Sequence, residues 1–502
     1  MKKIDCFVFL FALIAMVSCC PTDDNLRSMI PDDAVGVMTI DVPSILSKTG
    51  MAKGDSVTLP EELKKVIDDA DPTVLGDIIS NLPVSGIDVN SKSYVFFSPG
   101  IYKAVALIPL KDEDMAEKMV HKITSNKMTD IEGVDFATHL DYAYVVEDDV
   151  LMIGRYSTPV DANVASKAAS DIIGKKKPSF LANEEVVKNL PDSCDIGVYV
   201  NVKDFSTILK KNSRLSTIFG NVPAIDIITD SDIKAITAKV DFWVDTAEQQ
   251  AHIDTRIIYQ KDGQYQQLYD NLIAPSVDSA NSVLKLIPGD EELDTYIGMK
   301  IDGGKLSQMP QMSKMFEIFE ATPLTAGLKH KDMLASIHGA VVVGLGPSNS
   351  GDFNFVVAAQ STNPELLTQE IVEVANQRGQ SQLQRNGEYF YDHGSQGIAM
   401  GQTDKAFYLR CLDFASKYMA DELSAFPEVL EKCDVVVYKA LRIGDKTEGY
   451  LNWGLSDKAH GSGFYYAEDE KSNVVVSALK LLCWKEPNSS LQESDDDFDY
   501  GF

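Results

Sequence analysis

Basic residues are scarce in this chain. Its 502 residues include 46 Lys and Arg against 75 Asp and Glu, which gives a formal net charge of −29 at pH 7. A chain this acidic repels phosphate backbones, and we find no Lys/Arg-rich run that would act as a local exception. The composition therefore excludes nucleic acid as the main partner.

Cysteine is also rare. Beyond the N-terminal region the cysteines are Cys194, Cys411, Cys433 and Cys483, and no two of them form a C-x-x-C pair. Zinc ribbons and thioredoxin-type chemistry are therefore disfavoured. Cys194, Cys411 and Cys483 stand in apolar surroundings, so we predict that they are small buried residues, although export would permit disulfides.

The common catalytic motifs are missing as well. The sequence contains no His-Glu-x-x-His, no Walker loop and no calcium-binding loop. Carboxylates are so numerous that no catalytic pair can be singled out, which leaves a glycosidase pair open. We predict no metal, no cofactor and no assigned catalytic residue, and we favour a protein that is not an enzyme.

Long apolar runs are confined to the N-terminus. Lys2 and Lys3 precede an apolar stretch over residues 6–17, which is too short to span a bilayer but fits a signal peptide. A small residue and Cys19 follow, in a pattern that resembles the lipobox of bacterial lipoproteins. We predict a signal peptide over residues 1–18 and lipid attachment at Cys19, which would make the membrane a partner.

A polar tether over residues 19–29 is expected to follow the anchor. Asp23 and Asp24 stand four and five positions beyond Cys19. Acidic residues there resemble the signal by which Bacteroides-type lipoproteins reach the outer face of the outer membrane. We therefore predict an outer-membrane, lipid-anchored protein, exposed at the cell surface rather than on the periplasmic face. The alternatives are attachment at Cys20 and an ordinary secretory signal.

The body of the chain contains an internal repeat. Four segments share an apolar residue, a proline, one or more acidic residues and an alternating strand, expected at residues 35–41, 196–202, 296–302 and 434–438. A hairpin, a helix and a second hairpin follow both the first and the third strand. A long hairpin and a closing helix, at residues 277–286 and 473–483, follow the second and the fourth.

This order predicts a tandem duplication, A-B-A′-B′. The first half covers residues 30–286, with A over 30–189 and B over 190–286; the second covers residues 287–487, with A′ over 287–425 and B′ over 426–487. The predicted fold class is α+β, with antiparallel or mixed twisted sheets and helices on one face. Residues 488–502 are acidic and are predicted to form a disordered tail.

Two of the three tryptophans occupy matching places in the B copies. Trp243 and Trp453 each lie in a predicted strand just before a turn. An exposed pair could stack on sugar rings, whereas the simpler interpretation is a matched pair of core anchors. Burial of the two rings would separate these interpretations.

The lipobox, the segment that begins Ile30-Pro31-Asp32-Asp33 and the later Leu190-Pro191-Asp192 strand together resemble a family of Bacteroides-type exported lipoproteins classed as a domain of unknown function. The resemblance implies an exported, lipid-anchored protein and supplies no catalytic residues. Our leading hypothesis is a non-catalytic binding or scaffolding protein of the envelope, with a glycan or an envelope protein as its partner. The alternative is a surface hydrolase or a glycan-binding accessory protein acting on polysaccharide.

Overall fold

The structure, a computed structural model, describes residues 24–53, 56–69, 73–131, 133–156, 161–204, 232–245, 249–273, 293–321, 327–347, 353–377, 383–385, 388–393, 396–412, 433–469 and 471–484. The predicted signal peptide, Cys19 and Asp23 lie outside these residues. So do the helix predicted at residues 277–286 and the acidic tail. Below, the first half is the described part of residues 24–273 and the second half that of residues 293–484.

One large sheet dominates the described part of the chain. Twenty strands form it, every pairing is antiparallel, and the fold class α+β is confirmed. A separate hairpin consists of β2 (Ala52–Lys53) and β3 (Ser56–Val57). In the first half the strands of the large sheet are β1 (Gly36–Ile40), β4 (Ser93–Phe97), β5 (Tyr102–Pro109), β6 (Thr129–Ile131), β7 (Val134–His139), β8 (Tyr142–Glu147), β9 (Val150–Tyr156), β10 (Ile196–Asn201), β11 (Ile233–Trp243) and β12 (Gln250–Tyr259). In the second half they are β13 (Thr295–Asp302), β14 (Ile337–Pro347), β15 (Phe353–Ser361), β16 (Leu383–Arg385), β17 (Glu388–His393), β18 (Gln396–Gln402), β19 (Ala406–Leu412), β20 (Val435–Ile443), β21 (Lys446–Leu455) and β22 (His460–Ala467).

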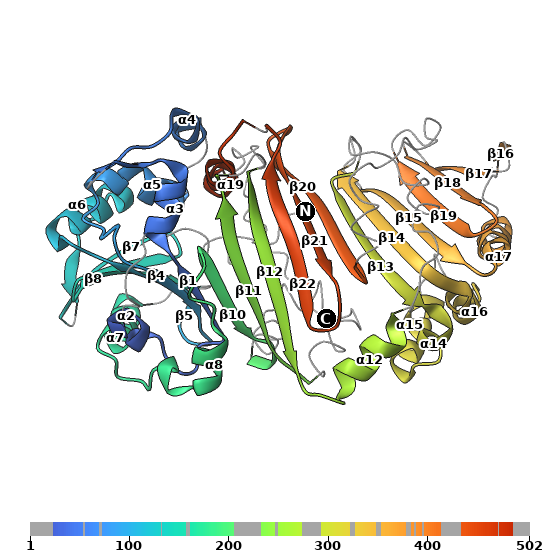
Figure 1. Cartoon of the computed structure of the whole chain (residues 1–502), viewed down its shortest axis with the longest axis horizontal. Helices are drawn as coiled ribbons and strands as arrows, with labels where there is room; N and C mark the ends of the chain where they lie inside the picture. The colour runs from blue at the N-terminus through green and yellow to red at the C-terminus, as the bar shows by residue number, and fades with distance from the viewer. Residues whose placement is uncertain are drawn as a thin grey trace.

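The strand order is the same when read outward from the centre in either direction. The central pair is β12 and β22, in register from Gln250 opposite Tyr466 to Arg256 opposite His460 (Figure 1). From β12 outward the order is β11, β10, β1, β4, β5, β9, β8, β7, β6. From β22 outward it is β21, β20, β13, β14, β15, β19, β18, β17, β16. Each strand therefore has a counterpart of the same rank in the other half.

The strands and hairpins predicted from the repeat are confirmed. The four repeated strands are β1, β10, β13 and β20, and the predicted hairpins are formed by β4 with β5, β8 with β9, β11 with β12 and their counterparts. The predicted helices in the two halves are α6 (Glu113–Thr124) and α17 (Pro364–Gln377). The closing helix of the chain is α19 (Val474–Cys483).

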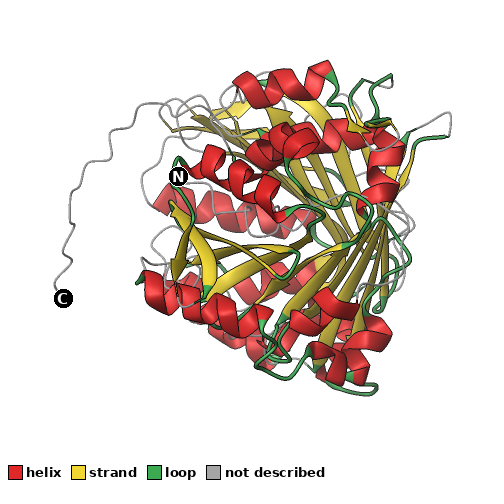
Figure 2. Ribbon diagram, turned by 90° about the vertical axis from the view of Figure 1, so that its left-hand side faces the viewer, coloured by secondary structure: helices red, strands yellow, loops and turns green. Residues whose placement is uncertain are grey.

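The prediction that helices cover one face of the sheet is wrong for the first half. One core cluster joins the sheet to the helices on one face, and a second core joins it to those on the other. Figure 2 shows helices on both sides of the strands. The first face carries α3 (Val42–Thr49), α4 (Glu61–Asp69), α5 (Val74–Asn81) and α6; the second carries α2 (Asp24–Met29), α7 (Ala162–Ile173) and α8 (Glu184–Asn189).

The physical reason lies in the outer strands of the first half. Every residue of β4 is buried, with Val95 and Phe97 in one core and Tyr94 and Phe96 in the other. A strand with apolar side chains on both faces must be covered on both. The predicted alternation of apolar and polar residues holds better in the central strands, such as β22.

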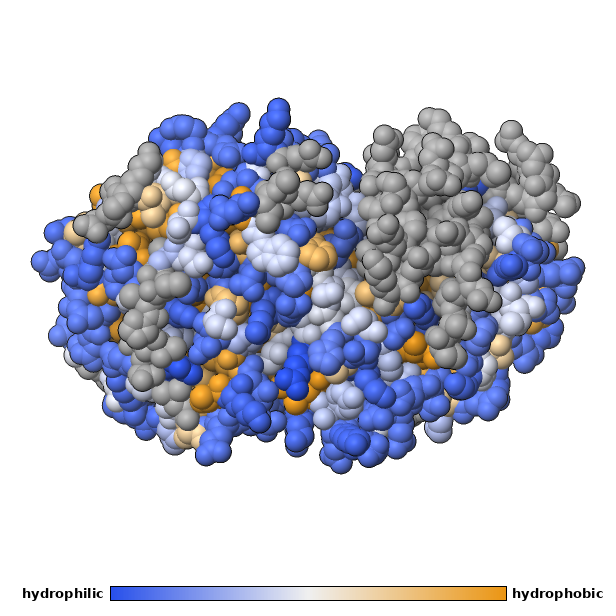
Figure 3. Space-filling model, viewed as in Figure 1, coloured by the Kyte–Doolittle hydropathy of each residue, from blue (hydrophilic) through white to orange (hydrophobic). Residues whose placement is uncertain are grey.

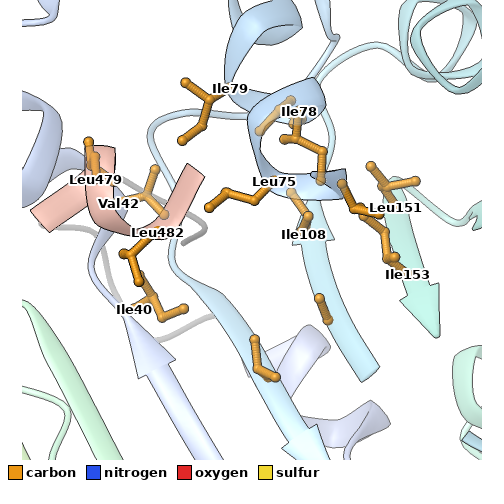
Figure 4. Close-up of a cluster of buried hydrophobic side chains, with 14 of the residues drawn as sticks. Ile40, Val42, Leu75, Ile78, Ile79, Ile108, Leu151, Ile153, Leu479 and Leu482 are labelled. Atoms are coloured by element: carbon orange, nitrogen blue, oxygen red, sulfur yellow. The ribbon is translucent and has the colours of Figure 1, made fainter. Parts of the chain in front are cut away.

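The two halves exchange helices across the central pair. Helix α19, from the end of the second half, packs on α3, α4 and α5 of the first half, where Leu479 and Leu482 join Val42 and Leu75 in one core (Figure 4). In the other direction, α12 (Gln264–Leu272) of the first half contacts α14 (Gly303–Leu306) of the second half. The other helices of the second half are α15 (Pro310–Ala321) and α16 (His330–Ser336).

Among the helices that the structure describes, none is both long enough and apolar enough to cross a bilayer. On the face seen in Figure 3, hydrophilic residues cover most of the described surface and hydrophobic residues form small separate patches.

Candidate functional site

Three rings form an exposed aromatic strip on the central strands. Trp243 is the last residue of β11, and His252 and Phe464 are direct partners on β12 and β22. The ring centroids lie 4.9 Å apart between Trp243 and His252, and 5.1 Å apart between His252 and Phe464. Trp243 is 42% exposed and Phe464 is 36% exposed, so both rings present apolar surface to solvent.

Strand register places the three rings on one face. Asp241 lies opposite His252, and Trp243 lies opposite Gln250, so Trp243 and His252 belong to the same set of alternating side chains. The outward positions of an antiparallel sheet with one solvated face are normally polar. Two exposed aromatic residues that contact the same histidine at such positions point to binding rather than to packing.

The strip continues into a tyrosine ladder that fixes its position. Tyr466 lies opposite Gln250 and Tyr450, on the same face as the strip. Centroid distances of 5.3, 5.8 and 5.6 Å connect Tyr466 through Tyr450 and Tyr438 to Tyr296. Tyr438 and Tyr296 are buried in the core of the second half, so the ladder runs from the half-buried Tyr466 into the interior.

Polar groups flank the strip. Asp254 lies two residues beyond His252 on the same face, with one carboxylate oxygen 3.6 Å from His252 Nδ1. Asn452 lies opposite Phe464 on β21. Rings beside a carboxylate and an amide offer a flat apolar surface together with hydrogen-bonding groups, which is how proteins hold a ring-shaped polar ligand.

Trp453, the second predicted stacking residue, does not join the strip. It lies opposite Gly463, one position out of phase with Phe464, so its ring projects from the other face of the sheet. Its indole Nε1 donates to Thr255 Oγ1 at 3.1 Å. A side chain at Gly461 would come within 2.7 Å of the indole, so the glycine is needed for this packing. The two tryptophans therefore lie on opposite faces of the sheet, and a role of either ring in ligand stacking stays a prediction.

A buried ionic cluster, Asp41, Ser44, Lys48, Lys92 and Asp195, lies at the edge of β1 and β10. Asp195 Oδ1 accepts from Ser44 Oγ and from Lys48 Nζ, the latter at 2.7 Å, and Oδ2 accepts from the Phe242 N–H at 2.6 Å. Lys92 lies 3.6 Å from Asp41. Burial raises the pKa of the Asp41 carboxyl, and neighbouring Asp195 adds to this, against the effects of the Ser44 N–H and Lys92.

The contacts of the ionic cluster indicate a structural role rather than a catalytic one. Both carboxylate oxygens of Asp195 are occupied by donors from the protein itself, and the residue is 2% exposed. A counterpart occurs in the second half, where Asp434 accepts from Tyr269 Oη and lies 3.7 Å from Lys300. The sequence carries a signal for both that our sequence analysis missed, because each aspartate follows a cysteine, Cys194 or Cys433, just before a strand.

The predicted burial of the cysteines is confirmed. Cys194, Cys411 and Cys483, for which burial was predicted, are buried, and so is Cys433. Burial raises the pKa of Cys194 and of Cys483 to about 12, so neither forms a reactive thiolate near neutral pH.

Of the predicted anchor residues, only Asp24 is described. It is the first residue of α2. Within the described ranges, no group of three or more His, Cys, Asp or Glu side chains is placed to hold a metal ion.

Comparison with solved structures gives only weak likenesses. Crystal form III of TP0453 is 11% identical with a TM-score of 0.30, over 52% of this chain and 90% of that one. Crystal form IV is 10% identical with a TM-score of 0.28, over 46% and 79%. Likeness at this level says nothing about function. No curated protein matches the chain.

A family model gives a far longer match. The family described as Domain of unknown function (DUF4836) matches residues 26–424. This segment contains every strand from β1 to β19, whereas β20 to β22 and α19 follow it. Because the match spans well over half of its length, the chain belongs to the DUF4836 family, whose function is unknown.

Proposed function

We propose that the chain is a lipid-anchored envelope protein of the outer membrane that binds a ligand without transforming it. The N-terminal pattern supports the anchor, because Lys2 and Lys3, the apolar residues 6–17 and Cys19 follow one another in the order that lipoprotein signals require. Asp23 and Asp24 support exposure at the cell surface rather than on the periplasmic face.

The exposed ring of Trp243, in contact with His252, which in turn contacts Phe464, is the observation that carries the binding role. The ligand class that suits it best is a neutral saccharide. Sugar rings present C–H groups that pack on aromatic faces, and their hydroxyls match groups such as Asn452 and Asp254. At the strip, the neighbouring Asp254 carboxylate and the net charge of −29 disfavour acidic ligands.

A surface hydrolase is the second candidate, and one observation favours it. Asp241 and Asp254 lie on either side of His252 on the same face of the sheet. They are diagonal cross-strand neighbours, and the residues at such positions of an antiparallel pair are typically roughly 7–8 Å apart. Glycosidase carboxylates stand about 5–9.5 Å apart. However, a carboxyl group usually becomes a general acid because burial raises its pKa, whereas the Asp254 side chain is 53% exposed. Binding is therefore favoured over hydrolysis.

We also propose that the two halves arose by tandem duplication, with A over 30–189, B over 190–286, A′ over 287–425 and B′ over 426–487. The equal rank of the strands on either side of β12 and β22 supports this, since ten strands recur in one order. The B and B′ units would then meet at the centre of the sheet, and the A and A′ units would occupy its two ends.

The anchor is tested by the mass of the mature protein. Expression in a host with lipoprotein processing should give a chain that starts at Cys19 and carries acyl groups. Cys19→Ser should remove the acyl mass and release the protein from the membrane fraction. An unchanged mass and unchanged membrane association in the variant would disprove attachment at Cys19.

The binding role is tested on a panel of neutral polysaccharides and oligosaccharides. Trp243→Ala should weaken binding roughly two- to tenfold, because loss of an aromatic contact costs about 0.5–1.5 kcal/mol and 1.4 kcal/mol is tenfold. Trp243→Phe, which keeps a ring, should retain most of the affinity. Turnover of any panel member, abolished by Asp254→Asn, would instead establish the hydrolase.

A further inference from the structure

A cavity of about 240 Å³ opens beside the N-terminal helix α2. It lies between α7 and the turn that joins β4 to β5. Its walls are largely apolar and its mouth carries charged side chains. The apolar wall includes Met29, Ile101, Tyr102, Val105, Ala168 and Ile172.

The walls of the cavity are held firmly. Tyr102 Oη donates to the Ala165 carbonyl of α7 at 2.7 Å, which ties the hairpin to the helix. Tyr102 and Val105 are buried in the core beneath α7. The cavity is therefore a feature of the packed structure and far exceeds the roughly 10–15 Å³ that a single water requires.

The cavity lies close to the end of the proposed tether. Asp24, the first residue of α2, is five residues beyond Cys19, and an extended chain spans at most about 3.6 Å per residue, or roughly 18 Å. Lys175 at the mouth donates to Asn25 Oδ1, so the mouth adjoins the start of the helix. If Cys19 carries lipid, this end of the molecule lies within a tether's length of the bilayer surface.

The mouth is lined by Lys175, Lys177 and Asp171. With Lys176 between them, the two lysines form a basic cluster, a short lysine run that the sequence analysis did not count as a local exception to the acidity of the chain. Lys176 pairs with Asp171 at 2.8 Å and Lys177 with Asp33 at 2.9 Å, and all four side chains are well exposed. Exposed pairs of this kind are weak, so their lysines can exchange a carboxylate for a lipid phosphate.

We propose that this cavity binds an anionic phospholipid of the membrane that the protein is anchored to. Part of an acyl chain enters between Tyr102 and Ile172, and the headgroup phosphate contacts Lys175 and Lys177. The proposal rests on the proposed lipid anchor, which brings the mouth to the bilayer. It adds a second, non-covalent contact that would orient the sheet relative to the membrane.

The test uses the mature chain from residue 19 with Cys19→Ser, which lacks a covalent lipid of its own. The protein is equilibrated with phosphatidylcholine vesicles containing phosphatidylglycerol, separated by gel filtration and examined by native mass spectrometry. We expect one phosphatidylglycerol per chain. Ala168→Phe, which fills the cavity, should lower the bound fraction at least tenfold, whereas the matched change Ala162→Phe on the exposed start of α7 should leave it within twofold.

The charge requirement is tested with the double variant Lys175→Glu, Lys177→Glu, which should lose the preference for phosphatidylglycerol over phosphatidylcholine. Equal lipid occupancy in the Ala168→Phe variant and the parent, both with cooperative thermal unfolding, would overturn the proposal. So would a parent that binds no lipid. If the Cys19→Ser chain binds phosphatidylglycerol but the acylated chain does not, the cavity holds the chain's own acyl group and the proposal is also wrong. Failure of the anchor itself would show separately, as absence of acyl mass on Cys19.

Discussion

At the scale of single residues, the Asp195 carboxylate bonds to several groups of the protein at once. It holds Ser44 and Lys48 of α3 and the backbone of Phe242 in β11 at once. The residue thus connects a helix and two strands through one buried carboxylate. Removing one partner of a buried ion pair leaves the other charge without compensation, which is far more costly than losing an exposed pair.

We therefore expect Asp195→Ala to lower the free energy of unfolding by about 3 kcal/mol. Asp171→Ala, which removes an exposed pair with Lys176, should cost less than about 1 kcal/mol. Urea denaturation followed by circular dichroism measures both. Similar losses in the two variants would show that the ionic cluster does not hold α3 in place.

Asp41 makes stability depend on pH. Burial raises its pKa, so the folded protein binds the proton more tightly than the unfolded chain does. The contribution of this residue is fully present below the unfolded value of about 3.9 and is lost as pH rises through the raised folded value. Asp41→Asn keeps a good N-cap for α3 but cannot titrate.

The Asn variant should thus lose less stability than the wild type as pH rises from about 4 toward neutrality. Urea midpoints measured at half-unit pH intervals check this difference. Parallel profiles for the two proteins would mean that the Asp41 carboxyl has an ordinary acidity in the folded state.

Residue types were easier to predict than residue directions. The apolar neighbours of Cys194 and Cys483 predicted their burial correctly. The matching positions of Trp243 and Trp453 suggested a common face, but a strand side chain changes face with every residue, and register between distant strands is not visible in the sequence. Trp243 was therefore a candidate from the sequence, but its simpler interpretation was a core anchor, and the exposure of the ring came from the structure.

At the scale of elements, α19 shows how a terminal helix can complete a distant core. Asn473 caps it through the Val475 and Val476 N–H groups and also donates to the Lys48 carbonyl at the end of α3. Lys480 pairs with Glu62 of α4 at 2.9 Å. The apolar face of α19 is buried among helices that precede it by some 400 residues in the chain. Loss of α19 would therefore open the core of the first half.

Leu479→Ala should reduce the free energy of unfolding by about 3 kcal/mol, since the side chain is 1% exposed and would leave a cavity. As a control, Leu140→Ala removes a side chain that is 79% exposed and should change stability by less than about 0.5 kcal/mol. Chemical denaturation monitored by tyrosine and tryptophan fluorescence gives both values. A small effect at Leu479 would mean that α19 is not part of the folded core.

Strands and helices with a clear periodicity were predictable from the sequence. Which faces of the sheet the helices cover was not. The alternating strands and the amphipathic α6 and α17 were found from pattern and capping signals alone. Helices such as α7 cover the second face of the first half because strands such as β4 carry apolar side chains on both faces. A comparison of repeated segments does not reveal this property of a strand.

At the scale of the whole molecule, the halves are joined in three ways. The β12 and β22 strands pair, α19 enters the core of the first half, and α12 reaches the second half, where Tyr265 Oη donates to the Lys458 carbonyl at 2.9 Å. A chain of this length usually divides into domains that unfold separately. Here each half depends on an element supplied by the other.

We expect one cooperative thermal transition for the mature chain. In scanning calorimetry, the calorimetric and van't Hoff enthalpies should agree within about 20%, the test of two-state unfolding. The reason is that opening either half removes packing from the other. Two resolved transitions would show that the central pair and the exchanged helices couple the halves only weakly.

The order of the strands and hairpins along the chain could be predicted from the sequence, but the central pairing could not. Proline, acidic residues and a strand recur at fixed rank, which predicted the order of elements correctly. Which two strands meet across the halves depends on the edges left open once each half has formed. That is a property of the assembled sheet, because the β12 residues from Gln250 to Arg256 carry no local mark of β22 as their neighbour.

The strand order also determines where the sheet stops. Among the described strands, the open edge of β12 pairs with the open edge of β22. No equivalent edge is left to which another group of ten strands could add. The remote ends are β6 and β16, each three residues long, too short to template another chain. Edges this short among the described strands would hinder copies of the chain from polymerising edge to edge.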